Sequence, residues 1–309
     1  MSFISVLFAL LLEQARPLGP GNPIHAGMRA WVRWCARNFD TNRPQHVWLA
    51  WSLAVGLPSV LALLVYWLLL TLAVWPLAML WSALVLYASL GFRQFSFHFT
   101  QIRDALAQGD ETLARALLAS WQQIDTQELQ HGHLIGRVIE ASVLASHRHV
   151  FGVLAWFSVL AAFGFGPTGA VLYRLGEFVA RYWQFKSLSQ QQPVSETLQK
   201  SAYLAWTLID WLPARITALG FAVVGNFEEA IDGWRQDAAQ SESNNDSLML
   251  AATAGAVNLQ LKRATSNPDA TQRPTPELAH LAIVVGLVWR AVVLWVFLLA
   301  LLTLARLLG

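Results

Sequence analysis

The sequence predicts an all-α, polytopic integral membrane protein with four to six membrane-inserted helices, one of them broken or re-entrant, joined by helical cytoplasmic segments. Of the 309 residues, 55% are hydrophobic and 13% are charged, whereas an average soluble chain has about 25% charged residues. No charged residue occurs between Val47 and Phe92. At ~1.5 Å per residue, a helical stretch of this length can cross a ~30 Å hydrocarbon core twice.

Residues 1–46 are expected to form a short apolar helix followed by a basic segment. The apolar start has no preceding Lys or Arg and lacks a small-residue cleavage site, so we expect a membrane-inserted or interfacial helix and not a cleaved signal peptide. The segment from Gln14 to His46 has an excess of arginine, which indicates that it stays on the cytoplasmic side.

Residues 47–91 are expected to form a transmembrane hairpin, with helices at about 47–69 and 74–91. A hairpin returns the chain to the side that it left, so residues 92–149 should be cytoplasmic as well. Apolar residues at helical spacing predict a soluble helical hairpin there. The sequence Gly-Asp-Glu at 109–111 interrupts the pattern, with Asp110 as the expected N-cap.

The remaining chain divides into three parts. Residues 150–183 contain an apolar stretch from Val150 to Leu175 that is interrupted at 163–169. Neither half is long enough to span alone, and one broken helix and a re-entrant pair both fit. Residues 184–277 hold a polar connector, the helix around "DWLPAR" and an acidic soluble segment. Residues 278–309 are expected to form a C-terminal transmembrane helix.

Two opposite charges lie inside the apolar run from 202 to 224, on either side of Pro213. These are Asp210 and Arg215, and ionisable groups inside a membrane are a functional hypothesis by default. Proline suits the first position of a helix, so we expect a new helix to begin at Pro213, with its positive N-terminal end favouring Asp210. The alternative is a helix lying along the interface, with both charges among the lipid headgroups.

Other patterns are weaker. Four histidines, in "HGH" (131–133) and "HRH" (147–149), make a metal site conceivable, with His147 and His149 as the weak candidates. Residues two apart on a helix face different sides, which favours solvated or interfacial histidines. Arg148 can bind an anion or anchor the helix at the interface. The net charge of +2 and the single Cys35 indicate neither a nucleic-acid partner nor a disulfide.

The segment "LIDWLPARITALGFAVVGNFEEAIDGW" (208–234) resembles the CobD/CbiB and AmpE superfamily of membrane proteins, and the likeness extends over roughly residues 90–235. The resemblance implies either adenosylcobinamide-phosphate synthases of cobalamin biosynthesis or AmpE proteins, inner-membrane relatives linked to β-lactamase induction.

Several carboxylates of the synthase pattern are replaced. The "GRDT" element reads "QIDT", which keeps Asp125 and Thr126, and a family glutamate is kept as Glu140. The following family Asp falls on Arg148, and "YKAVNTLDS" reads "YRLGEFVAR" (173–181). The N-terminal "GDP" with "HPV" is reduced to "GNP" and His25. Because magnesium needs oxygen ligands, these losses favour a member of the family that is not a synthase.

The AmpE-type pattern is closer at the same places. It has a Gly-Pro in the broken apolar segment, here Gly166–Pro167, and a "DW-x-P-x-R" element, here 210–215. We therefore expect an AmpE-like signalling or accessory protein of the bacterial inner membrane, with its polar loops mainly cytoplasmic. Its partners would be the lipid bilayer and an anionic small molecule or signalling protein.

Two alternatives remain. The first is a divergent adenosylcobinamide-phosphate synthase that forms an amide bond with ATP and magnesium; no other cofactor is expected. The second is a structural membrane protein with remnants of an ancestral site. No catalytic residue is assigned, and the expected ligand-binding residues are His25, Asp125, Thr126, Glu140, Arg148, Asp210, Pro213 and Arg215.

Overall fold

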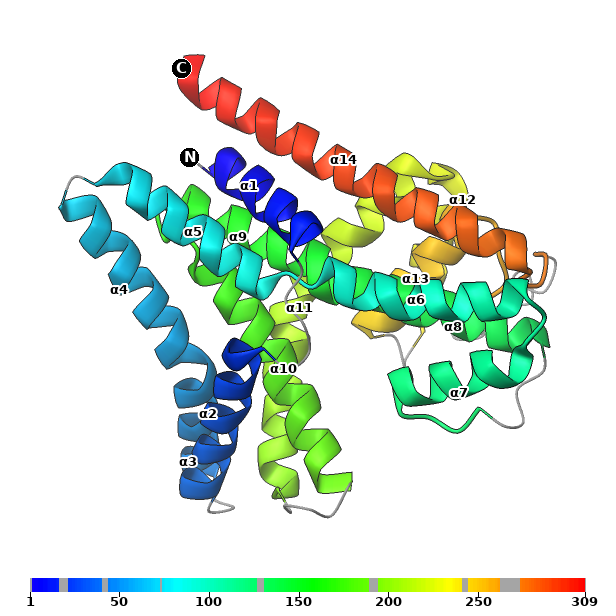
Figure 1. Ribbon diagram of the computed structural model, residues 1–309, viewed down its shortest axis with the longest axis horizontal. Coiled ribbons are helices and arrows are strands. Elements are labelled where there is room, and N and C mark those ends of the chain that lie inside the picture. Colours follow the sequence, from blue (N-terminus) through cyan, green and yellow to red (C-terminus); the bar gives the residue numbers. More distant parts are fainter. Residues whose placement is uncertain are drawn as a thin grey trace. The chain divides into compact units, whose positions relative to one another are not determined.

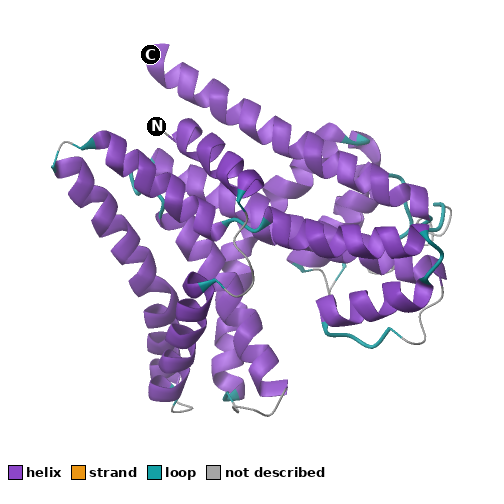
Figure 2. Cartoon of the chain, in the orientation of Figure 1, coloured by secondary structure: helices purple, strands orange, loops and turns teal. Residues whose placement is uncertain are grey.

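The computed structural model describes residues 2–16, 22–40, 44–72, 74–126, 131–188, 194–240, 244–261 and 273–308. These residues form helices and connecting loops without strands (Figure 2), so the predicted all-α class is confirmed. The helices are α1 (Ser2–Ala15), α2 (Pro23–Phe39), α3 (Pro44–Trp51), η1 (Ser52–Gly56), α4 (Leu57–Thr71), α5 (Trp75–Ser89), α6 (Phe92–Ala107), α7 (Glu111–Gln122), α8 (His131–Ser146), η2 (His147–Phe151), α9 (Gly152–Ala162), α10 (Thr168–Leu188), α11 (Glu196–Val224), α12 (Phe227–Ala238), α13 (Asn245–Ala256) and α14 (Leu278–Leu308).

Among the residues that the structure describes, four helical runs are long and apolar enough to cross a membrane: His46–Thr71, His131–Ala162, Glu196–Val224 and Leu278–Ala305. This agrees with a polytopic membrane protein, although the assignment of individual spans differs from the prediction. The second helix of the expected hairpin is α5, whose 15 residues reach ~22 Å and fall short of a ~30 Å hydrocarbon core.

The run 131–162 joins α8, η2 and α9 into one helical stretch, where the sequence suggested a boundary at 149. Its ionisable residues obscured the apolar character of the stretch. In the structure 67% of the most apolar 18-residue segment of this run is buried. The side chain of Glu140 is buried as well.

The helices form two compact units. Unit 1 comprises residues 1–91, 148–213 and 299–309, and unit 2 comprises residues 92–147 and 214–298. In unit 1, α5 packs on α1 and α4, and α10 packs on α4, α5 and α9 (Figure 1). In unit 2, α6 packs on α7 and α8, and α12 packs on α13.

A tight turn separates α9 from α10 at residues 163–167. Gly164 and Gly166 have φ angles of 83° and 54°, which favour glycine over residues with a side chain. A Cβ on Gly166 would also lie 2.6 Å from the ring of Tyr66. The indole of Trp67 donates a hydrogen bond to the Gly164 carbonyl at 3.0 Å, so α4 holds the turn.

The prediction that a helix begins at Pro213 is wrong, because Pro213 lies inside α11. Proline has no N–H to donate to the carbonyl four residues earlier, which here belongs to Ile209. The indole N–H of Trp156 on α9 donates to that carbonyl at 2.8 Å. The helix continues because a side chain of a neighbouring helix replaces the missing donor.

We therefore expect Trp156→Phe to destabilise the protein by about 1–3 kcal/mol, the usual cost of an unsatisfied buried polar group. The same substitution made together with Pro213→Ala should cost less, since residue 213 then supplies its own N–H. A double-mutant cycle of unfolding free energies in detergent measures the difference. Equal costs in the two backgrounds would contradict this explanation of the unbroken helix.

Candidate functional site

Three ionisable residues of α10 form an ion-pair cluster around a buried glutamate in unit 1. Arg174 and Arg181 lie one turn before and one turn after Glu177, on the same face of the helix. Arg174 Nη1 is 2.8 Å from Glu177 Oε2, and Arg181 Nη1 is 3.0 Å from Glu177 Oε1. The exposed side-chain fractions are 12% for Arg174, 4% for Glu177 and 52% for Arg181. Glu177 is thus enclosed between an inner and an outer arginine.

The electrostatic balance of this cluster is positive. Burial by itself would raise the pKa of Glu177, but the charges of Arg174 and Arg181 outweigh it and lower the pKa to about 2. Arg148, on η2, contributes in the same direction. Glu177 therefore stays ionised, and within the cluster one carboxylate faces the two guanidinium groups of Arg174 and Arg181. Such a surplus of arginine attracts carboxylates and phosphates.

A second buried contact joins α10 to α11. The hydroxyl of Tyr173 donates to Asp210 Oδ1 at 2.8 Å, and both side chains are buried. Burial and the Asp210 carboxylate raise the pKa of Tyr173 well above its ordinary value, so the phenol keeps the proton that it donates. A Cβ on Gly152 would lie 2.0 Å from Tyr173 Cζ. Glycine at the start of α9 therefore makes room for the ring.

A cavity of about 430 Å3 lies beside the cluster, walled by side chains of α2, α4, α5 and α10. This volume is within the usual range of ligand pockets. Its lining is mostly apolar, with His25, Ser89 and Arg174 as polar members. Burial, followed by the charges of Arg174 and Arg29, lowers the pKa of His25. At neutral pH Arg174 is therefore the charged group of this lining.

The structure divides the eight expected ligand-binding residues between the two units. His25, Arg148, Asp210 and Pro213 belong to unit 1, and Asp125, Thr126, Glu140 and Arg215 belong to unit 2. In unit 1, His25 lines the cavity and Asp210 holds Tyr173, while Pro213 is a buried position within α11.

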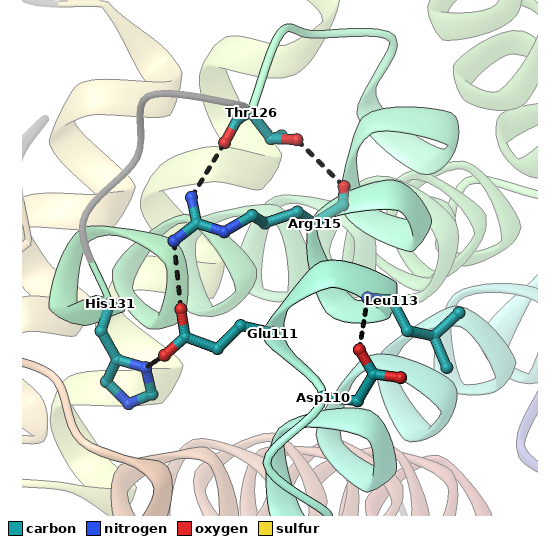
Figure 3. A network of polar contacts seen from close by, with 6 residues as sticks. All are labelled: Asp110, Glu111, Leu113, Arg115, Thr126 and His131. Carbon is teal, nitrogen blue, oxygen red and sulfur yellow. Dashed lines mark hydrogen bonds and ion pairs between the residues drawn. The ribbon is translucent and has the colours of Figure 1, made fainter.

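In unit 2, Asp125 and Thr126 follow α7, and a polar network anchors this loop (Figure 3). Thr126 Oγ1 donates to the Arg115 carbonyl at 3.0 Å, and Arg115 Nη1 donates to the Thr126 carbonyl at 3.1 Å. Arg115 also donates to Glu111 at 3.1 Å, and Glu111 contacts His131. Hydrogen bonds from His131 and Arg115 lower the pKa of Glu111. Buried Thr126 thus fastens the loop to α7, whereas Asp125 is exposed.

The start of α7 follows the prediction. Asp110 accepts a hydrogen bond from the Leu113 N–H at 2.9 Å, as an N-cap does (Figure 3).

The other predicted residues of unit 2 contact neighbouring side chains. Buried Glu140 accepts from Arg137 at 3.1 Å, within α8. Arg215 donates to Asn245 of α13 at 3.2 Å. His147 Nδ1 lies 2.9 Å from Thr217 Oγ1, and both residues are buried.

A metal ion would need several donor side chains placed around one point. The residues that the structure describes contain no cluster of three or more His, Cys, Asp or Glu side chains placed to hold one ion. In unit 1, Glu177 and Asp210 already accept from arginine and tyrosine donors. Magnesium in ATP-using sites is usually held by one or two carboxylates together with substrate phosphates. These two carboxylates do not fit that role, and we assign no magnesium ligand.

Comparison with known proteins shows the family. Residues 6–295 match the family described as CobD/Cbib protein. The chain belongs to the CobD/CbiB family. The cobalamin biosynthesis protein CobD of Chromobacterium violaceum is 30% identical over 244 residues, which cover 73% of each chain. CobD of Stutzerimonas stutzeri is 29% identical over 263 residues, 81% of this chain and 80% of the relative. No solved structure matches the chain.

The expectation of an AmpE-like signalling protein is therefore wrong. This CobD/CbiB-family chain has relatives named for cobalamin biosynthesis, which supports the alternative. The two features that favoured AmpE serve the fold: Gly166 lies in the turn against Tyr66, and Pro213 leaves the carbonyl to which Trp156 donates. Residues that satisfy backbone geometry do not distinguish one function from another.

The residues of the α10 cluster are not among the ligand-binding residues expected from the sequence. They fall within "YRLGEFVAR" (173–181), which stands where the synthase pattern has "YKAVNTLDS". The available signal was the spacing of an acid between two bases at positions 174, 177 and 181, which puts all three on one face of a helix. That Tyr173 reaches Asp210 depends on the approach of α10 to α11, which the sequence does not show.

Proposed function

We propose that this CobD/CbiB-family protein catalyses the amide-forming step that the family resemblance implies, the ATP-dependent synthesis of adenosylcobinamide phosphate. One observation carries the proposal. The family match extends over residues 6–295, and relatives covering about three quarters of the chain are named cobalamin biosynthesis protein CobD.

We assign the anionic group of a substrate to the α10 cluster. Arginine offers a planar fork that binds carboxylate or phosphate through two hydrogen bonds. Arg181 is the outer member, with 52% of its side chain exposed, so it can meet a ligand that enters from water. Glu177, which also pairs with Arg174, holds Arg181 in place from the buried side. Asp210 and Tyr173 fix α10 against α11 and position the cluster.

The proposal includes the location of the protein. We place it in the bacterial inner membrane with its polar segments mainly cytoplasmic, because α2 carries several arginines and short arginine-rich segments stay on that side. Reporter fusions after α2 and after α7 test the orientation. Both should report the cytoplasm, and a periplasmic signal from either fusion would contradict it.

The function itself is tested by complementation. Expression of the chain in a bacterial strain lacking its own synthase should restore cobalamin-dependent growth and the formation of adenosylcobinamide phosphate, measured by chromatography of cell extracts. An expressed, membrane-inserted protein that restores neither would overturn the proposal.

Within that assay, Arg181→Gln should lower amide formation by about 10- to 100-fold, in line with the loss of a charge-assisted contact of 1.5–3 kcal/mol. The loss should show mainly as a higher KM for the anionic substrate. Lys200→Gln is the matched control, since Lys200 also pairs with a glutamate four residues away, at 3.1 Å, but is 75% exposed. Equal activities of the two variants would remove Arg181 from the site.

A further inference from the structure

We propose that the cavity between α2, α4, α5 and α10 binds one anionic membrane lipid, with an acyl chain in the cavity and the headgroup against His25, Arg29 and Arg174. This inference does not depend on the amide-forming reaction. It rests on where the cavity opens, on what lines it and on the charges beside it.

The cavity opens on a surface of α4 that a membrane would cover. Leu61 and Val65 line it, yet 52% and 36% of these residues are exposed. Both lie in the candidate span His46–Thr71, which also exposes Leu64 and Leu68. Apolar side chains on such a helix face acyl chains in a bilayer. A lipid can therefore enter the cavity sideways, without passing through water.

The walls suit a hydrocarbon chain. The lining includes Trp31, Ala62, Trp81, Val85 and Val171. The N–H of Trp81, the polar atom of that ring, donates to the Ala62 carbonyl at 3.1 Å and is thereby satisfied. The N–H of Trp31 has no hydrogen-bond partner among the described residues, and an apolar chain would leave it so. The chain gains contact with the apolar walls, at ~25 cal/mol per Å2 of buried apolar surface.

The charges beside the cavity select an anionic headgroup. Arg174 lines it, and Arg29 lies one helical turn after His25 on α2, so both point to the same side of that helix. His25 and Arg174 line the same cavity, and the pKa of His25 is lowered by burial and by the charges of Arg174 and Arg29. On α10, the negative charge of Glu177 offsets one of the two positive charges of Arg174 and Arg181. The remaining positive charge attracts a phosphate-bearing headgroup.

Gly27 provides a variant that closes the cavity without disturbing the fold. It is an exposed helical residue of the lining, and a Cβ there would meet no atom within 4 Å. Gly27→Leu should place its side chain at the opening. Gly286→Leu is the matched control, because Gly286 is also helical with no atom within 4 Å of its Cβ position and is not part of this lining. Thermal unfolding in detergent should show both variants folded.

Native mass spectrometry of the full chain, with phosphatidylglycerol or phosphatidylcholine added to the detergent, counts the lipids retained. We expect the wild type and Gly286→Leu to retain one phosphatidylglycerol at a concentration about tenfold below that needed for phosphatidylcholine. Gly27→Leu should need at least tenfold more phosphatidylglycerol. Equal retention by Gly27→Leu and Gly286→Leu would overturn the cavity as the binding site.

The headgroup contact is tested separately. Arg29→Gln should reduce the preference for phosphatidylglycerol over phosphatidylcholine while leaving retention of phosphatidylcholine unchanged. Glycerophosphoglycerol, the deacylated phosphodiester headgroup with the same single negative charge, should not displace the bound lipid at equal concentration. Its displacement of the lipid would assign the charges to a free phosphate, and an unchanged preference in Arg29→Gln would overturn the headgroup assignment.

Discussion

Glu177→Gln should lower the free energy of unfolding by about 3–5 kcal/mol, the usual cost of removing one partner from a buried ion pair. The substitution keeps the size of the side chain but removes the charge that faces Arg174 and Arg181 at 2.8 and 3.0 Å. Arg174, with 12% of its side chain exposed, would then hold a positive charge with little access to water. The loss is measured as the midpoint and free energy of unfolding in detergent.

Glu196→Gln is the control for this prediction. Glu196 pairs with Lys200 across the same four-residue spacing, but the two side chains are 83% and 75% exposed. Exposed pairs contribute about 0–1 kcal/mol, so this variant should unfold close to the wild type. If Glu177→Gln were as stable as Glu196→Gln, the α10 cluster would be no more than a surface ion pair.

Gly152→Ala should destabilise the protein by about 1–3 kcal/mol or more, as overpacking of a full interior does. Two opposing effects act here. Alanine is favoured over glycine within a helix by about 1 kcal/mol, but its Cβ would lie 2.0 Å from Tyr173 Cζ. The ring has little room to move, because Tyr173 is buried and its hydroxyl is bonded to Asp210 at 2.8 Å. The clash therefore outweighs the helix preference.

The sign of the effect distinguishes this explanation from a general change in helix stability. Gly286→Ala in α14, where a Cβ meets no atom within 4 Å, should stabilise the protein by up to about 1 kcal/mol. Shortening the opposing side chain with Tyr173→Ala should make the Gly152→Ala substitution far less costly, which a double-mutant cycle measures. A stabilised Gly152→Ala variant would show that the ring yields without strain.

Much of the architecture follows from composition and local pattern. The low fraction of charged residues and the uncharged stretch from 47 to 92 are enough to predict a helical membrane protein, because a bilayer leaves few other ways to satisfy the backbone. The N-cap at Asp110 was also predictable, since one side chain and the next turn of helix form it. The individual membrane spans were harder to predict. Helix α5 is short for a span, and charged residues obscured the apolar character of the run 131–162.

The candidate site was largely out of reach of the sequence. Motif comparison selected Asp210 and Arg148 but attached them to the wrong function, because it weighed a few replaced carboxylates more than the extent of the likeness. It missed Tyr173 and Glu177, whose partners become visible once α10 is placed in the structure. His25 and Arg174 likewise line the same cavity although they are 149 positions apart in the sequence.

By itself, then, the sequence determined the helical class, the membrane setting and the family resemblance, all of which depend on composition or on residues close together in the chain. The tertiary structure decided that α11 continues through Pro213, because the donor to the Ile209 carbonyl is Trp156 on α9. It also decided that Asp210 is a hydrogen-bond partner of Tyr173 and not an unpaired charge in a membrane. In both cases a polar group that looks costly in one helix is satisfied by a side chain of another, and only the approach of the helices brings that partner near.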